Sequence, residues 1–259
     1  TGKTRIESDL IGAREIPAEA LYGVQTLRGI ENFSISKFRL SEYPLFIKGL
    51  AITKMAAAMA NFELGLLTVE QKDAIIAACG EILDGKHHDQ FPVDMIQGGA
   101  GTTTNMNANE VIANRALELM GHERGEYQYC SPNDHVNCSQ STNDAYPTAI
   151  HIGMYFKHLQ LLPHLEELIA SFRKKGEEFS QIIKMGRTQL EDAVPMTLGQ
   201  TFNGFASILQ DEIAHLNEAA ADFLVVNMGA TAIGTGICAE PGYAEKCIAA
   251  LREITGWDI

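Results

Sequence analysis

The hydrophobic and polar positions of the chain predict a protein built mostly of α-helices. In the second half of the sequence, apolar residues recur at spacings of three and four, which is the spacing of one helix face. Thr68 with Gln71, and Thr197 with Gln200, have the pattern of a capping box and mark two helix starts. We predict helices over residues 45–67, 68–85, 105–120, 147–172, 197–226 and 241–256.

Strands have little place in this pattern. The sequence contains no block of strand-forming residues with regular hairpin turns. Residues 5–33 contain Gly12, Pro17 and Gly23, so we expect an irregular segment with at most a short hairpin. The stretch Gly186–Gln200 joins the two longest helices and is expected to be a loop.

The sequence pattern changes to long helical stripes after Asn143, and this change divides the chain into two predicted domains. Residues 1–142 are expected to form a mainly helical N-terminal domain. Residues 143–259 contain two long helices joined by a loop, which indicates an elongated helical bundle. Two long helices and one shorter helix make an incomplete bundle. We therefore expect residues 143–259 to be the first part of a central domain that other helices complete.

Composition and charge exclude several classes of partner. The chain has 259 residues and a net charge of −13, which argues against nucleic acid and against an anionic membrane surface. No uninterrupted apolar run reaches the length of a transmembrane helix. The five cysteines are scattered without a CxxC pair, and residues 1–10 lack the apolar core of a signal peptide. We expect a cytoplasmic protein with reduced thiols and no membrane partner.

The stretch QGGAGTTTNMNANEV, residues 97–111, combines glycines, hydroxyls and amides at the start of a predicted helix. It lacks the lysine of a phosphate-binding P-loop. The free N–H groups of a helix N-terminus, with the hydroxyls of Thr102, Thr103 and Thr104, can nevertheless bind an anion. The alternative interpretation is a capped helix with an asparagine-rich polar face.

Two further clusters resemble this stretch in kind. QSTNDAYPT, residues 140–148, precedes a predicted helix, and GRTQLEDAVPMTLGQ, residues 186–200, joins the two long helices. Each cluster alone could be helix capping. Neutral donors also suit a carboxylate whose charge grows during a reaction, because they add no counter-charge that stabilises the ground state. The residues concerned are Ser141, Thr142, Asn143, Thr188 and Gln189.

The histidines are weaker candidates for chemistry. His87 and His88 follow a predicted helix end, and no second set of ligands lies at a metal spacing, which favours a solvated turn. His135 could act as a general base, but a hydrogen-bonded structural histidine is the simpler interpretation. No Ser–His–Asp arrangement can be assigned from the sequence.

Taken together, these segments resemble the aspartase/fumarase superfamily. GTTTNMNANE, QSTNDAYPT and GRTQLEDAVPMTLGQ are similar to three characteristic segments of that family, in the family's order. Residues 4–33 are similar to its N-terminal segment. Three residues are most similar to the aspartase branch, namely Gly99 in DQFPVDMIQGGAGT, His135 in PNDHVN, and Gln189. Some members of that branch carry histidine at the position of Gln189.

The resemblance implies a fold, a reaction and an assembly. The fold is almost all helical, and four subunits pack their long helices into one core as a homotetramer, with three subunits contributing to each active site. The reaction is the reversible deamination of L-aspartate to fumarate and ammonia. No organic cofactor is implied. A divalent metal such as Mg²⁺ activates some members, and the sequence locates no site for it.

The resemblance also assigns roles to the polar clusters. Thr102, Ser141 and Thr142 would hold the β-carboxylate of the substrate, which becomes an aci-carboxylate when the Cβ proton leaves. Neutral hydroxyl donors suit these roles, because the negative charge grows on the β-carboxylate that they would hold. The remaining contacts would be made to the amino group by Thr102, Asn143 and Gln189, and to the α-carboxylate by Thr188.

One part of the family's machinery is not found between Thr1 and Ile259. The family's general base is a serine on a mobile loop of the form GSSxMPxKxN, whose lysine and asparagine bind the α-carboxylate. We expect that loop to lie beyond Ile259, so the sequence corresponds to the N-terminal part of an aspartase and would be inactive alone. Two alternatives stay open, namely a fumarase-type hydratase and a non-catalytic helical assembly protein.

Overall fold

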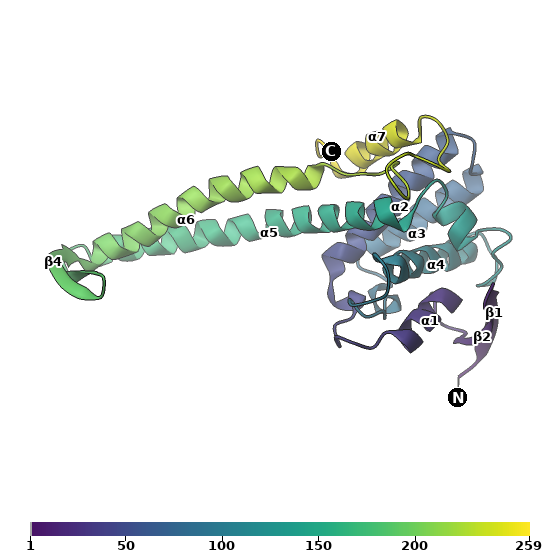
Figure 1. Cartoon of the computed structure of the whole chain (residues 1–259), viewed down its shortest axis with the longest axis horizontal. Coiled ribbons are helices and arrows are strands. Elements are labelled where there is room, and N and C mark those ends of the chain that lie inside the picture. Colours follow the sequence, from purple (N-terminus) through teal and green to yellow (C-terminus); the bar gives the residue numbers. More distant parts are fainter. Residues whose placement is uncertain (1) are drawn as a thin grey trace. The chain divides into compact units, whose positions relative to one another are not determined.

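The computed structural model describes residues 2–259, and the fold is mainly helical, as predicted (Figure 1). The chain divides into two compact units. The first comprises the residues up to Met154 together with Leu224–Ile259, and the second comprises Tyr155–Phe223. This division differs from the predicted limit between residues 142 and 143, because the last helix packs against the N-terminal half. The division into family domains stays a prediction.

Four helices form the body of the first unit. They are α2 (Pro44–Glu63), α3 (Val69–Leu83), α4 (Thr102–Leu119) and α7 (Tyr243–Thr255). α2 packs against α3 and α7, and α4 packs against α3. Three short helical segments belong to the same unit, namely η1 (Leu40–Glu42) before α2, η2 (His88–Gln90) before α4 and the π-helix η3 (Pro132–Val136) after it.

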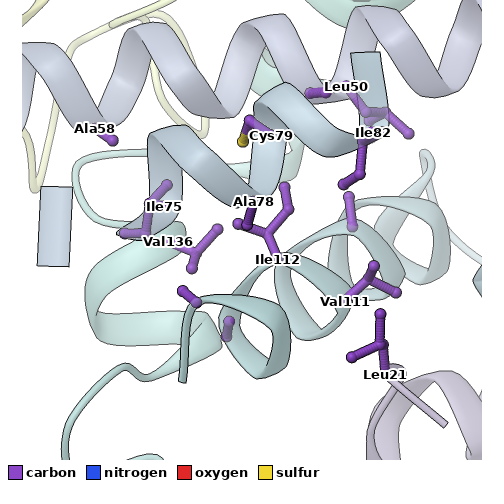
Figure 2. Packing of buried hydrophobic residues seen from close by; sticks show 14 of the residues in the cluster. Leu21, Leu50, Ala58, Ile75, Ala78, Cys79, Ile82, Val111, Ile112 and Val136 are labelled. Atoms are coloured by element: carbon purple, nitrogen blue, oxygen red, sulfur yellow. The ribbon is translucent and has the colours of Figure 1, made fainter. Parts of the chain in front are cut away.

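The hydrophobic core of the first unit lies where α2, α3 and α4 meet (Figure 2). Ile75 and Ile82 of α3 are buried in one cluster with Val111 and Ile112 of α4. Leu21, from the segment before the first helix, joins the same cluster. Each such side chain contributes about 1.5–3 kcal/mol relative to leaving it exposed, so this cluster fixes the frame on which the polar residues are mounted.

The N-terminal segment contains more regular structure than predicted. β1 (Thr4–Asp9) and β2 (Gly12–Pro17) form the short hairpin, paired antiparallel with Thr4 opposite Pro17. The helix α1 (Val24–Asn32) follows, so the expectation of an irregular segment is wrong there.

A distant carboxylate explains why α1 forms. Glu110 of α4 is buried, and its side chain accepts hydrogen bonds from the backbone N–H groups of Gly23, Gln25 and Thr26. Glu7 of β1 accepts a further one from the N–H of Val24. Two carboxylates therefore satisfy the first N–H groups of α1, and the local sequence carries no sign of either.

The second unit contains two long helices joined by a β-hairpin (Figure 1). α5 (Thr142–Glu178) begins in the first unit and continues into the second, and α6 (Leu198–Ala221) returns beside it. Phe172 of α5 lies 5.9 Å and 5.7 Å, between ring centroids, from Phe202 and Phe205 of α6. The predicted apolar stripes therefore pack against each other.

The connection between α5 and α6 is a hairpin, so the expectation of a loop is wrong. β3 (Ile183–Thr188) pairs antiparallel with β4 (Glu191–Thr197). Gln189 and Leu190 between them have φ values of 49° and 69°. Two consecutive residues with positive φ make the turn whose twist suits a tight hairpin. Neither residue is the asparagine or glycine that usually signals such a turn, which is why the pattern missed it.

Several predicted helix limits are also displaced, including the end of α5, which lies at Glu178 rather than at residue 172. α4 begins at Thr102 rather than at residue 105, and α5 begins at Thr142 rather than at residue 147. α6 ends at Ala221 rather than at residue 226. The first turns of α4 and α5 are polar, so hydrophobic spacing could not mark them. The predicted capping boxes at Thr68 and Thr197 are confirmed.

By length and composition, α2 could cross a membrane. However, 67% of its most apolar 18-residue window is buried inside the structure. Lys48 and Lys54 also interrupt its apolar sequence. Burial of this kind is typical of a core helix.

α2 and the start of α5 approach each other closely through two glycines. A Cβ added at Gly49 would overlap the backbone oxygen of Ala149, and one added at Gly153 would lie 3.1 Å from the backbone oxygen of Leu45. Backbone atoms cannot move aside as the end of a side chain can. Both positions therefore require glycine for packing rather than for a special φ value.

We predict that Gly49→Ala lowers the free energy of unfolding by about 1–3 kcal/mol, because the added methyl group overpacks a helix contact. Gly80→Ala is the matched control, since Gly80 is also within a helix and an added Cβ meets nothing within 4 Å. That control should gain about 0.5–1 kcal/mol from helix propensity. Urea denaturation followed by circular dichroism measures both, and equal stability of the two variants would contradict the packing argument.

Candidate active site

A side chain outside the helix holds the N-terminus of α4. The N-cap residue Gly101 has φ 89°, a left-handed conformation that favours glycine, and no side chain of its own with which to cap. Gln97 supplies the cap instead, because its Oε1 accepts from the N–H of Thr104 at 2.8 Å and its Nε2 donates to Thr104 Oγ1 at 2.7 Å. Thr102 is therefore not the capping residue, and it is exposed in the first turn.

The asparagines of α4 face the interior, so the asparagine-rich face of the helix is buried. Asn105, Asn107 and Asn109 are all buried. Asn107 Nδ2 donates to the backbone oxygen of Gln90 at 3.0 Å. Asn109 Nδ2 donates to Asn137 Oδ1 at 3.1 Å. Buried amides are costly unless they are hydrogen-bonded, so these residues tie α4 to the segments around it.

The first turn of α5 lies directly beside the first turn of α4. Asn105 Nδ2 donates to Thr142 Oγ1 at 3.1 Å. A Cβ at Gly101 would overlap the ring of Tyr146, which shows how closely the two turns approach. Both helices direct their N–H groups and the positive ends of their dipoles to these turns. Four of the predicted site residues, Thr102, Ser141, Thr142 and Asn143, therefore belong to two adjacent helix N-termini.

Asn143 has its amide orientation set by a loop that follows α6 in sequence. Asn143 Nδ2 donates to the backbone oxygen of Ala232 at 2.8 Å. Asn227 Nδ2 donates in return to the backbone oxygen of Asn143 at 3.1 Å. Since the nitrogen faces the loop, Asn143 presents its Oδ1 as an acceptor, which suits an ammonium group.

The buried side chain of Asp144 holds the same loop, residues 227–232, through hydrogen bonds. Its side chain is buried, with Oδ2 accepting from the N–H groups of Gly229 at 3.1 Å and Thr231 at 2.9 Å. Its Oδ1 accepts from the N–H of Ser141 at 2.9 Å. Burial raises the pKa of Asp144 above its usual range, and the three N–H donors oppose that shift. One carboxylate thus joins the start of α5 to the loop at 227–232.

Thr188 and Gln189 lie in the second unit, so the structure does not group them with the other four residues. Thr188 is the last residue of β3 and pairs with Glu191, and Gln189 follows in the turn. Both are exposed. Their predicted contacts to the amino group and α-carboxylate stay predictions.

Lys54 of α2 lies behind the paired helix N-termini and is fully buried. Its Nζ donates to Asn105 Oδ1 at 2.7 Å, to Gln140 Oε1 at 2.8 Å and to Asn137 Oδ1 at 2.9 Å. Asn137 Oδ1 accepts from Asn105 Nδ2 and Asn109 Nδ2 as well, both at 3.1 Å. A network of amides around one amine therefore lies under the candidate site.

Two opposing effects act on the charge of Lys54. Burial lowers its pKa to about 7, and the negative charge of Asp144 acts in the opposite direction. The geometry favours the ammonium form, because three carbonyl oxygens match its three N–H donors. A neutral amine would turn a lone pair toward one of those oxygens.

His135 is hydrogen-bonded at Nδ1, as a structural histidine would be. Its Nδ1 accepts from the N–H of Ser131 at 2.7 Å, and its Nε2 lies 3.3 Å from Gln71 Nε2. Burial lowers its pKa, with a smaller opposing effect from Asp134. His87 contacts Glu81, and His88 contacts the backbone oxygen of Ile82. Within residues 2–259, no group of three or more His, Cys, Asp or Glu side chains is placed to hold a metal ion.

Sequence reasoning missed the residues that support the site. Gln97, Lys54 and Asp144 are each separated from the group that they hold by several residues or by whole helices. A lysine within the Ala- and Met-rich stretch of α2 was the one available signal, since lysine is rarely buried unless it is paired.

Comparison with known proteins places the chain in a family. A family model described as "Lyase" matches residues 12–258. The chain belongs to this lyase family, within the aspartase/fumarase superfamily. Aspartate ammonia-lyase from Pseudomonas canavaninivorans is 56% identical over 253 residues, covering 97% of this chain and 53% of that protein. Aspartate ammonia-lyase from Escherichia coli (strain K12) is 54% identical over 254 residues, covering 98% of this chain and 53% of that protein.

Solved structures of this lyase family share the fold. A fumarate lyase:delta crystallin from Brucella melitensis, bound to cobalt, has a TM-score of 0.97 and 52% identity, covering 99% of this chain and 56% of that one. The class II fumarase from Schistosoma mansoni has a TM-score of 0.90 and 37% identity, covering 98% of this chain and 53% of that one. The chain spans about half the length of the curated relatives that it matches.

We predict that Asp144→Ala accelerates amide hydrogen exchange at Gly229 and Thr231, because both N–H groups lose their acceptor. Hydrogen–deuterium exchange read by mass spectrometry on peptides covering 227–232 measures the change. Asp134→Ala is the control, since the Asp134 carboxylate accepts from Ser131 Oγ, beside η3 and not in the loop at 227–232. Unchanged exchange in Asp144→Ala would mean that the loop is held by other contacts.

Proposed function

We propose that the protein containing this chain is an aspartate ammonia-lyase that converts L-aspartate reversibly to fumarate and ammonia. The observation that carries the proposal is the pairing of two helix N-termini through Asn105 and Thr142, which groups Thr102, Ser141, Thr142 and Asn143. Relatives named aspartate ammonia-lyase at 54–56% identity support the same reaction. Membership of the lyase family supports carbon–nitrogen bond cleavage.

The paired helix N-termini would stabilise the intermediate. Removal of the Cβ proton places a second negative charge on the β-carboxylate, and Thr102, Ser141 and Thr142 would donate hydroxyl hydrogen bonds to it. Fixed neutral donors are most effective at the point where charge develops. The Oδ1 of Asn143, turned outward by Ala232, would accept from the substrate ammonium group.

The rest of the machinery belongs to the proposal for the whole protein. Thr188 and Gln189 would contact the α-carboxylate and amino group, and a serine loop of the family type would supply the general base. We propose no organic cofactor, and a divalent metal such as Mg²⁺ would act as an activator. The free cysteines of the described residues suit a reducing cytoplasm.

A homotetramer is part of the same proposal. Several large apolar side chains of α5 and α6 are exposed in this chain, and further helices would cover them. They are Leu159, Leu161, Leu168, Phe205 and Ile208. A non-catalytic helical assembly protein would share this feature, but it would not need the hydroxyl and amide cluster.

We expect the whole protein to deaminate L-aspartate and not to hydrate fumarate to malate appreciably. Gln189 offers an amide oxygen to an ammonium group and cannot exchange a proton near neutral pH, which favours the ammonia-lyase over the hydratase. The ultraviolet absorbance of fumarate, with L-aspartate, D-aspartate or L-malate supplied separately, measures the reaction. Comparable turnover of malate would reject the proposal in favour of a fumarase.

We expect Thr102→Val in the whole protein to lower kcat for aspartate by roughly a hundredfold to a thousandfold, because one donor to the developing charge is lost. The melting temperature should hold, since Gln97 and not Thr102 caps α4. Thr102→Ser, which keeps the hydroxyl, is the matched control and should retain most activity. A fall in melting temperature with unchanged kcat per folded molecule would mean that Thr102 is a structural residue.

A further inference from the structure

The hydroxyl of Thr142 can either donate or accept a hydrogen bond, and only a donating hydroxyl can bind a carboxylate. The neighbouring side chain of Asn105 decides whether this hydroxyl donates or accepts. Asn105 Nδ2 donates to Thr142 Oγ1 at 3.1 Å, so the oxygen lone pair is used as an acceptor. No acceptor for the Thr142 hydroxyl hydrogen is formed within residues 2–259. That hydrogen therefore stays available to a ligand.

The orientation of the Asn105 amide is fixed by its other contacts. Its Oδ1 accepts from Lys54 Nζ at 2.7 Å, and its Nδ2 donates to Asn137 Oδ1 at 3.1 Å. Turning the amide over would place an N–H group against the Lys54 amine and two oxygens against each other. Asn105 can thus present only an N–H group to Thr142.

Lys54 is held in turn by amides that cannot rotate. Gln140 Nε2 donates to the backbone oxygens of Val136 and Cys138, at 2.9 Å and 3.0 Å, so its Oε1 must face Lys54. Lys54 is fully buried, and within residues 2–259 its Nζ donates to three neutral amide oxygens and to no carboxylate. A buried ammonium of this kind is costly, and its packing role could be met by an apolar residue.

We propose that Lys54 and Asn105 are positioning residues that orient the Thr142 hydroxyl so that it donates to the substrate carboxylate. The inference rests on the proposed function, which assigns the carboxylate to Thr142. Neither residue touches the substrate, because both are buried behind the helix N-termini. Lys54 acts through Asn105, whose amide it polarises, and Asn105 acts through Thr142.

A double-mutant cycle tests the pathway in the whole protein. Asn105→Asp keeps size and shape and still accepts from Lys54, but it replaces the donor by an oxygen, so the Thr142 hydroxyl must donate inward. We expect kcat for aspartate to fall about a hundredfold, as for Thr142→Val, and the double variant to fall no further than either single variant. If the two losses multiply to about ten-thousandfold, Asn105 does not act through Thr142 and the inference is overturned.

Thr53→Val is the matched control for effects of α2 and its burial. Thr53 precedes Lys54, is equally buried, and donates only to the backbone oxygen of Gly49 in its own helix. Its kcat per folded molecule should be unchanged, and the double variant with Thr142→Val should show only the loss of Thr142→Val alone. A loss in Thr53→Val as large as that in Asn105→Asp would assign both effects to general disturbance of the helix and would overturn the inference.

A crystal structure of Lys54→Met gives a readout that does not depend on activity. Without the ammonium, Asn105 should leave its present orientation, and the distance from its side-chain nitrogen to Thr142 Oγ1 should exceed 3.5 Å. A distance that stays near 3.1 Å would overturn the role of Lys54. If the unaltered protein does not deaminate aspartate, the proposed function fails while this structural result still decides the positioning role.

Discussion

The structure depends on the hydrogen bonds by which polar side chains buried in the helical core join distant segments of the chain. α4 carries four buried asparagines, α2 carries a buried lysine and α5 carries a buried aspartate. Each of these side chains joins its helix to a segment far away in the sequence, and none could be left unpaired without a cost comparable to a large part of the net stability. The hydrophobic cluster brings the helices together, and the polar contacts select the register in which they meet.

The helical frame could be predicted from the sequence, because it depends on local patterns. Thr68 and Thr197 marked helix starts through capping boxes, and both are confirmed. Elements that depend on residues distant in the sequence, or on unusual backbone angles, were not predicted. α1 exists because Glu110, in another helix, satisfies its first N–H groups, and the β3–β4 hairpin turns through two residues that rarely adopt positive φ. No local spacing encodes either arrangement.

The sequence predicts a chemistry for the candidate site but not the side chains that support it. The small polar residues near Thr102 and Thr142 stand out in a sequence, since hydroxyls and amides at helix starts have few other uses than capping and binding. The side chains that orient them, Gln97, Lys54 and Asp144, become visible only when the helices are packed. Thr188 and Gln189 lie in the second unit, and their grouping with the other four residues stays a prediction.

The single oxygen Asn137 Oδ1 accepts from Lys54, Asn105 and Asn109 at once. Replacing Asn137 removes an acceptor from Lys54, Asn105 and Asn109 together, and replacing Lys54 leaves Asn105 Oδ1 without its donor. Evolution by single substitutions would therefore pass through poorly folded variants before it reached another set of residues that satisfies these hydrogen bonds. We therefore expect these four residues to change rarely and together during evolution. The apolar side chains of the core around them can change by one methyl group at a time.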